Sequence, residues 1–274
     1  MNLFLNPNYD YQQINALNHS GMKYLERSPA HYRAWREGLL DTQSTLAQSF
    51  GIATHCAVLE PEKFAEDYYC LPDTSHCSSA GQKAAMTKAA KKDLESNSNK
   101  LLLGYADYHA ILNIRNAMYQ HPFGKFLIEE AQKETIHTWM DKPSGANCKC
   151  RTDFWLPRTQ LLADLKVCQD LSDDAFSRHV ANYKIHRQAA FYLDGVGAEN
   201  FLIVGVERTP PYAIRIFVVP EFLLKIGRSL YKPLCQKYQD CVETKSWPGF
   251  NLNLTPLQLP AYAIPDLILD QVAA

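Results

Sequence analysis

Residues 151–168 read RTDFWLPRTQLLADLKVC, and they carry the clearest structural signal in the sequence. Two apolar segments flank a turn over residues 157–160, which is the pattern of two antiparallel strands joined as a hairpin. Asp153 lies on the first strand. Asp164 and Lys166 lie two residues apart on the second strand, so their side chains leave it on the same face. In a hairpin of this length the three charged groups are expected to converge.

The convergence of two acids and a lysine predicts a metal-dependent site. Two neighbouring carboxylates repel each other unless a cation lies between them, and Mg²⁺ prefers a few carboxylate oxygens plus water. A lysine beside them can orient a water molecule or stabilise a developing negative charge. Asp-x-Lys on a strand is often only a surface salt bridge. Here, however, LLADLKV (161–167) is apolar enough for an inner strand, where charged side chains are rarely buried without a partner or a purpose.

The segments around this hairpin predict a mixed α/β architecture. Short, alternating or β-branched apolar runs indicate strands, and runs with apolar residues at helical spacing indicate helices. Strands before and after a helical pair favour a central mixed sheet with helices on its faces. Strands are expected over 134–141, 147–157, 160–168, 200–208 and 212–220, and helices over 173–183, 184–197 and 221–243.

The N-terminal half is predicted to be helical. Pro29 is expected to interrupt or start a helix, and residues 51–60 (GIATHCAVLE) form a buried helix that carries His55. Residues 77–95 are rich in Ser, Ala and Lys and read as a mobile basic loop or a short helix. Residues 100–131 are helical by periodicity.

We expect one domain over residues 1–274. Its predicted parts are a helical part (1–131), a core of sheet and helices (132–220), and a C-terminal helix with an extended, proline-rich tail (221–274).

Composition excludes several classes of protein. With 274 residues, 46% of them hydrophobic and 21% charged, the chain suits a soluble globular protein. Its net charge of -1 does not attract nucleic acid by itself, so DNA binding requires a local basic patch. No apolar run is long enough for a membrane span and no secretory signal precedes the first helix, so we expect a cytoplasmic protein without membrane partners. The eight cysteines are expected to be reduced.

Short motifs in a fixed order resemble the PDDEXK nuclease superfamily, in particular the RecE-like (exodeoxyribonuclease VIII type) phage exonucleases. They include an acid followed by acid-x-Lys on the next strand, a RecB-type histidine upstream and a Q-x-x-x-Y motif downstream. LNHSGMKYLERSPAHY (17–32) and WPGF (247–250) followed by LP are similar to the opening and closing segments of the group. The residues that carry the motifs are His55, Asp153, Asp164, Leu165, Lys166, Gln188 and Tyr192.

The resemblance implies a role for each of these residues. His55, Asp153 and Asp164 would ligate a divalent metal, together with the backbone carbonyl of Leu165, and Lys166 would be the catalytic lysine. Mg²⁺ is the implied cofactor, with Mn²⁺ as the alternative. A core histidine is the alternative reading of His55.

Two further groups of residues are left with open roles. Gln188 and Tyr192 would flank the site, touching the DNA backbone or holding the lysine strand in place, although a helix-packing pair has the same spacing. Glu134 matches an acid that is common on the first strand, but we assign it no role. An iron–sulfur cluster, which some RecB-type nucleases carry, is not expected, because Cys235 and Cys241 lack the CxxC half of that pattern.

The resemblance implies a Mg²⁺-dependent DNA exonuclease with an α/β PDDEXK (restriction-endonuclease-like) core. It would resect linear double-stranded DNA 5′→3′ and leave 3′ single strands for a phage annealing recombinase, in a ring-shaped homo-oligomer. A ring would hold a nearly neutral protein on DNA. The alternatives are a structure-specific or nicking endonuclease on the same core and a non-catalytic DNA-binding phage accessory protein.

Overall fold

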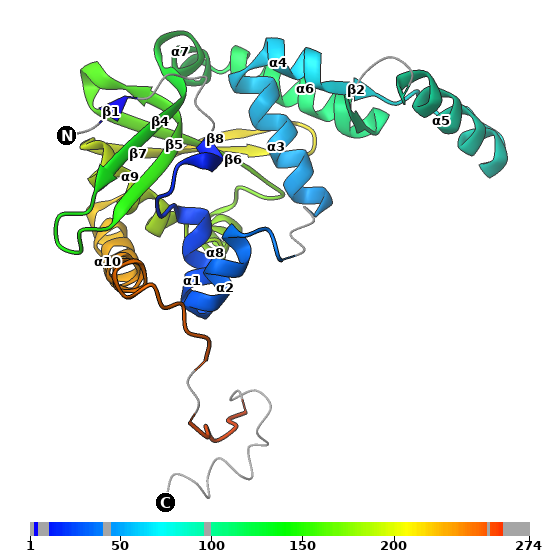
Figure 1. The fold of residues 1–274 in the computed structure, drawn as a ribbon. Helices are drawn as coiled ribbons and strands as arrows, with labels where there is room; N and C mark the ends of the chain where they lie inside the picture. Colours follow the sequence, from blue (N-terminus) through cyan, green and yellow to red (C-terminus); the bar gives the residue numbers. More distant parts are fainter. Residues whose placement is uncertain (1–2, 5–10, 41–44, 96–99, 251–252, 260–274) are drawn as a thin grey trace, which may run out of the picture.

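The computed structural model describes residues 3–4, 11–40, 45–95, 100–250 and 253–259. Its centre is a six-stranded sheet in the order β1-β4-β5-β6-β7-β8 (Figure 1). β6 and β7 pair in parallel and the other neighbours are antiparallel, so the predicted mixed sheet is confirmed. The strands are β1 (Leu3–Phe4), β4 (Gln132–Met140), β5 (Asn147–Leu156), β6 (Leu161–Cys168), β7 (Asn200–Glu207) and β8 (Ile214–Val218).

Helices cover both faces of this sheet, because alternate strand residues point to opposite sides. Trp155 and Leu162 belong to one buried cluster, whereas their neighbours Phe154 and Ala163 belong to the other. The first cluster contains residues of α1 (His19–Arg27), α2 (Pro29–Arg36), α8 (Asp173–Asn182), α9 (Ile185–Val196) and α10 (Glu221–Thr244), and the second contains residues of α3 (Leu46–Leu59), α4 (Pro61–Asp67), α6 (Tyr105–Gln120) and α7 (Pro122–Glu130).

In the part of the chain that the structure describes, no helix is both long and apolar enough to cross a membrane.

The helix that carries His55 begins earlier than predicted. It starts at Leu46 rather than at residue 51, because a capping box defines its first turn. The Thr45 hydroxyl accepts a hydrogen bond from the Gln48 backbone N–H (3.2 Å), and the Gln48 side chain accepts one from the Thr45 N–H (3.0 Å).

Residues 68–103 also differ from the prediction. The segment expected to be a loop or a short helix contains α5 (Ala80–Glu95), a helix of 16 residues that projects away from the sheet (Figure 1). The predicted helix over 100–131 is wrong at its start, where β3 (Leu101–Leu103) pairs in parallel with β2 (Tyr68–Cys70). A run of three leucines satisfies a strand as well as a helix, so periodicity does not separate the two.

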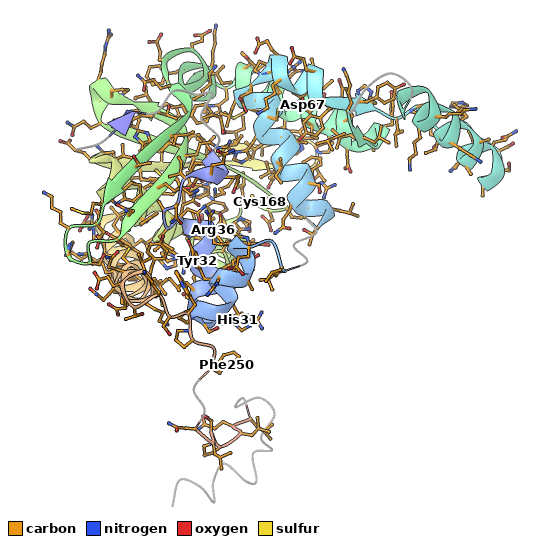
Figure 2. All side chains as sticks on the ribbon, in the orientation of Figure 1. His31, Tyr32, Arg36, Asp67, Cys168 and Phe250 are labelled. Atoms are coloured by element: carbon orange, nitrogen blue, oxygen red, sulfur yellow. The ribbon has the colours of Figure 1, made fainter. Side chains whose placement is uncertain are left out.

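The segment after α10 packs against α2. The rings of Tyr32 and Trp247 stack with centroids 5.5 Å apart, and the Ala30 N–H donates to the carbonyl of Pro248 (3.0 Å). Figure 2 shows Phe250 beside His31, with ring centroids 5.6 Å apart. The remainder of the predicted tail includes 251–252 and 260–274, which lie outside the described residues.

All eight cysteines are free thiols. A hydrogen bond with Cys235 raises the pKa of the Cys148 thiol, and burial raises it further. These two thiols therefore lie in contact between β5 and α10 inside the first hydrophobic cluster, and they do not form a metal site at the surface.

A buried lysine ties the N-terminal turn to the sheet, and its removal is expected to destabilise the fold. The Lys149 ammonium donates to the backbone carbonyls of Tyr11 (2.6 Å) and Ile14 (2.9 Å). Lys149→Met leaves both acceptors without this donor, at about 1–3 kcal/mol for each buried group. We expect the urea midpoint of the full chain to fall by several tenths of a molar or more, whereas exposed Lys142→Met leaves it unchanged. An equal midpoint for both variants would contradict this role of Lys149.

Candidate metal centre

Three acids lie in a row across β4, β5 and β6. The β5–β6 pairing ends at Phe154 opposite Ala163, and Asp153 opposite Asp164 is the next position in the same register. The two strands separate at this point. On the other side of β5, the pairs before and after Glu134 place it opposite Asp153. The convergence of acids predicted for the hairpin thus extends to a third strand.

The backbone of Glu134 is in the left-handed region, with φ of 50°. A non-glycine residue in this conformation costs about 1–2 kcal/mol. The ladder between β4 and β5 is interrupted at Glu134 and Asp153, although the pairs on both sides are regular. Strained backbone of this kind concentrates at functional sites, where the surrounding structure holds it in place.

His55 reaches this row of acids from α3. Its Nδ1 lies 3.4 Å from Asp153 Oδ2, which also accepts a hydrogen bond from the Leu165 backbone N–H (2.7 Å). One ligand atom each of His55, Glu134 and Asp153 lies within 4.8 Å of the others. The structure therefore groups Glu134, to which the sequence assigned no role, with two of the residues that the resemblance implied as ligands.

Asp164 is held beside this group by two partners. The Lys166 ammonium forms an ion pair with Asp164 Oδ2, and the Gln188 side-chain amide donates to Asp164 Oδ1 (2.8 Å). Asp164 is only 3% exposed. Of the two positions expected for Gln188, at DNA or on the lysine strand, the structure places its side chain on the acid of the lysine strand.

The charges of the centre shift the pKa values of its members. Burial, followed by the neighbouring Asp153 carboxylate, raises the pKa of Glu134 to about 7. Burial lowers the pKa of His55, but the Asp153 carboxylate outweighs it and the net pKa is raised. Burial raises the pKa of Asp153, yet His55 and Lys166 outweigh it and the net pKa is lowered. Burial and the neighbouring charges of the same site thus determine the pKa values of Glu134, His55 and Asp153.

The residues of the centre fit a divalent cation. Glu134 Oε2 and Asp164 Oδ2 are buried and accept no well-aligned hydrogen bond, although each lies next to a cationic side chain, Arg151 at 2.6 Å and Lys166 respectively. Carboxylate oxygens with one imidazole nitrogen suit hard or borderline divalent ions such as Mg²⁺ and Mn²⁺. His55, Glu134 and Asp153 are the residues that would hold such an ion, with Asp164 adjacent.

The centre opens into a pocket of about 830 Å³. Tyr11 and Tyr192 line it together with residues of α3, α4 and β5. Burial raises the pKa of the Tyr192 phenol well above its usual value, so this hydroxyl stays protonated. His55, Glu134 and Asp153 all line this pocket, so the centre is accessible from it.

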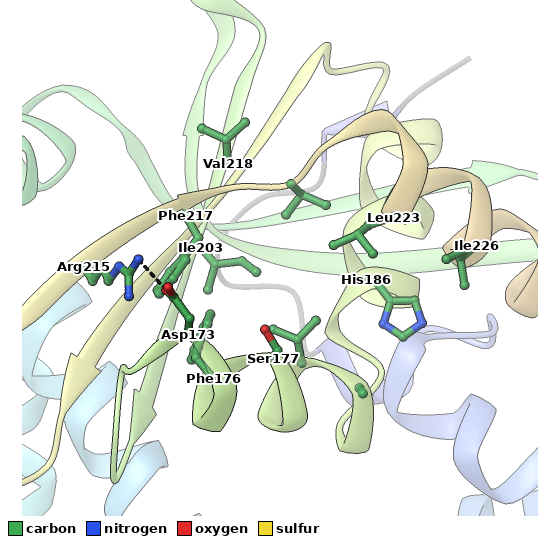
Figure 3. Close-up of a pocket in the computed structure, with 13 residues that line it drawn as sticks. Asp173, Phe176, Ser177, His186, Ile203, Arg215, Phe217, Val218, Leu223 and Ile226 are labelled. Atoms are coloured by element: carbon green, nitrogen blue, oxygen red, sulfur yellow. Dashed lines mark ion pairs between the residues drawn. The ribbon is translucent and has the colours of Figure 1, made fainter.

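A second pocket, of about 540 Å³, lies between α8, β8 and the start of α10 (Figure 3). Its lining is mostly apolar, with Phe176, Phe217 and Leu223, and an ion pair between Asp173 and Arg215 (2.6 Å). The lining does not include the predicted site residues, so the chemistry of the centre belongs to the larger, more polar pocket.

Gln188 is expected to act as a positioning residue for Asp164. Gln188→Leu removes the hydrogen bond to Oδ1 and is expected to lower the rate of a metal-dependent reaction at this centre about 10–100-fold, the range for partners that orient a metal site. Because the side chain contacts the acid, we expect kcat to fall while KM stays unchanged. Gln236→Leu on the exposed face of α10 is the matched control. A raised KM at constant kcat would instead indicate that Gln188 binds DNA.

Comparison with known proteins agrees with the fold. A family model described as a PDDEXK-like domain of unknown function (DUF3799) matches residues 18–251. The fold is similar to the crystal structure of a presumed exonuclease from Eubacterium rectale, with a TM-score of 0.60 and 16% identity over 99% of this chain and 98% of that one.

A phage-related exonuclease from Haemophilus somnus 129PT matches with a TM-score of 0.36 and 12% identity, over 62% of this chain and 90% of that one. No curated protein matches the sequence.

Proposed function

The chain belongs to the PDDEXK-like family DUF3799, and on this premise we propose that it is a Mg²⁺-dependent DNA exonuclease of the RecE-like type. The observation that carries the proposal is the fork between β5 and β6. There Asp153 and Asp164 face each other, with Glu134 and His55 on one side and Lys166 on the other. His55, Glu134 and Asp153 line one pocket, and Asp164 and Lys166 lie behind them on β6. Acids, an imidazole and a lysine in this arrangement suit hydrolysis of a phosphodiester.

Each residue of the centre has a distinct part in the proposed reaction. When bound, a divalent cation neutralises charge that develops on the scissile phosphate. Burial lowers the pKa of Lys166, but Asp164 and Asp153 outweigh it and the net pKa is raised, so the ammonium is charged at neutral pH. Lys166 donates hydrogen bonds to the attacking water or to the phosphate. Gln188 and the Leu165 N–H hold the two aspartates in place.

The substrate and the product are proposed from the resemblance. We infer 5′→3′ resection of linear double-stranded DNA, which leaves 3′ single strands for an annealing recombinase encoded by the same phage or prophage. The proposed setting is the cytoplasm of the bacterial host, and the proposed assembly is a ring-shaped homo-oligomer. A ring that encloses DNA supports retention by a chain whose net charge is only -1.

The test uses one linear duplex labelled at either the 5′ or the 3′ end and one closed circular plasmid, with Mg²⁺, Mn²⁺ or EDTA. The proposal predicts metal-dependent release of the 5′ label first and an intact plasmid. Nicking of the plasmid would show that the protein is an endonuclease rather than an exonuclease. Release of the 3′ label first would show that it degrades DNA in the 3′→5′ direction. Unchanged DNA with both metals would indicate a DNA-binding protein without catalysis.

A further inference from the structure

Residues 68–95 and 100–103 form an arm that extends from the body of the protein (Figure 1). β2 and β3 pair as its two-stranded stem, and α5 projects beyond them (Figure 1). The described side chains of α5 are exposed or half-buried, and none of them joins either hydrophobic core. Since α5 does not contribute to the core, the charge of its exposed side chains is the property that indicates what it binds.

The projecting helix carries a net positive charge, because its four lysines, Lys83, Lys88, Lys91 and Lys92, outnumber its two acids, Asp93 and Glu95. Both acids lie in its last turn, so residues 80–92 are basic although the whole chain has a net charge of -1. Lys83, Lys88 and Lys91 are exposed. At 3.6 residues per turn and 1.5 Å per residue, these three lysines lie within about 140° of the helix surface and about 12 Å of its length. This is the local basic patch that DNA binding by a nearly neutral chain requires.

The base of the arm is the rim of the metal-site pocket. Lys63, Asp67 and Tyr68 line that pocket, and Tyr68 is also the first residue of β2. The other strand of the stem is fixed to the same helix, because the Lys100 ammonium donates to the carbonyl of Ala65 on α4 (2.8 Å). Figure 2 shows Asp67 on α4, between the body and the arm. The basic helix is thus joined, through β2 and residues 71–79, to a residue that lines the metal-site pocket.

We propose that α5 binds the phosphate backbone of double-stranded DNA beyond the end held at the metal centre, through Lys83, Lys88 and Lys91. This inference rests on the proposed function and adds to it a site for the uncut part of the substrate. Lysines contact phosphates without reading sequence. Single strands are usually bound on aromatic side chains, and α5 (AGQKAAMTKAAKKDLE) has none, so duplex DNA is the favoured partner.

The test compares wild type with Lys83→Gln, Lys88→Gln and Lys91→Gln combined, in which glutamine preserves helix propensity. Binding of a labelled blunt duplex is measured by anisotropy in EDTA, so that no cleavage occurs, over a series of salt concentrations. We expect an affinity about tenfold or more below that of wild type, and a salt slope reduced by roughly 0.9 for each phosphate that the variant no longer neutralises. Replacement of the same three lysines by arginine is expected to preserve binding.

The matched control removes the same charge elsewhere: exposed Lys225, Lys232 and Lys237 of α10 are replaced by glutamine, with no expected change in affinity or slope. Hydrolysis of bis(p-nitrophenyl) phosphate with Mn²⁺ reports on the metal centre alone and should be equal in wild type and the α5 variant. Equal affinity and slope in wild type and the α5 variant would overturn the inference.

The other outcomes are equally decisive. Loss of binding to phosphatidylserine vesicles with unchanged DNA affinity would assign the arm to a membrane surface and overturn the inference. A lower rate with the small ester in the α5 variant would show that the substitutions disturb the metal centre, and it would overturn a separate DNA role. If wild type hydrolyses neither DNA nor the ester, the proposed function fails, whereas binding in EDTA still decides the role of the arm.

Discussion

Asp153→Asn is expected to abolish metal-dependent DNA hydrolysis, with a loss well beyond the 10–100-fold typical of outer partners of a metal site. Asp153 joins α3 and β6 at the centre, since it lies 3.4 Å from His55 and accepts the Leu165 N–H at 2.7 Å. Asparagine keeps the shape and still accepts that N–H, but it removes the charge. Mn²⁺ binding, measured by calorimetry, should be lost together with the rate.

The control for this variant is Asp240→Asn, an exposed acid on α10. It should leave the rate and Mn²⁺ affinity at wild-type values, and thermal melting should show that both variants are folded. An Asp153→Asn protein that hydrolyses DNA at the wild-type rate would remove the centre from the reaction and favour a non-catalytic DNA-binding protein.

Lys166→Met is expected to lower the rate about 10²–10³-fold while Mn²⁺ affinity changes little. Lysine offers donors and a positive charge, so its loss removes stabilisation of the reacting phosphate rather than a metal ligand. The substitution also removes the ion pair with Asp164, while the hydrogen bond from the Gln188 amide continues to hold that buried acid. Comparison of the Mn²⁺ affinity, measured by calorimetry, with the rate of hydrolysis therefore distinguishes the role of the lysine from the role of the acids.

Lys225→Met, an exposed position on α10, serves as the control for the lysine variant. A Lys166→Met protein that loses Mn²⁺ binding in parallel with activity would show that the lysine organises the centre and does not act on the substrate.

The sheet could be predicted from the sequence because its signals are local. Alternation over 147–168 defines a hairpin, and the burial of Phe154 and Ala163 on one face and Trp155 and Leu162 on the other follows from the same alternation. The spacing of Asp164 and Lys166 then places them together without further information. The helical pair after β6 and the long C-terminal helix were also expected at nearly their observed bounds.

Glu134 shows what local patterns leave open. Its position opposite Asp153 depends on the register of β4 against β5, and its left-handed backbone depends on the surrounding structure. Neither can be read from the segment itself, because propensity reflects only neighbouring residues. The available signal was the resemblance, in which Glu134 matches an acid that is common on the first strand, and this match gives it no role.

The sequence allows a short helix in the arm, but the length of α5 and the β2–β3 stem were missed for a different reason. The Ala and Lys residues of α5 favour a helix. A helix in a globular protein is usually recognised by its apolar face, however, and because α5 has none, the pattern also fits a loop. The parallel pairing of β2 with β3 joins strand residues that are more than thirty positions apart in the sequence. A short apolar run does not indicate which distant segment it pairs with. Elements without a core face are where periodicity is least informative.

The most direct test of the central claim is release of acid-soluble nucleotides from linear duplex DNA, with Mg²⁺ or EDTA, by wild type and Lys166→Met. We expect release by wild type with Mg²⁺, none in EDTA and a rate about 10²–10³-fold lower in the variant. Release that persists in EDTA, or that is equal in the two proteins, would contradict a metal-dependent centre built from Asp153, Asp164 and Lys166.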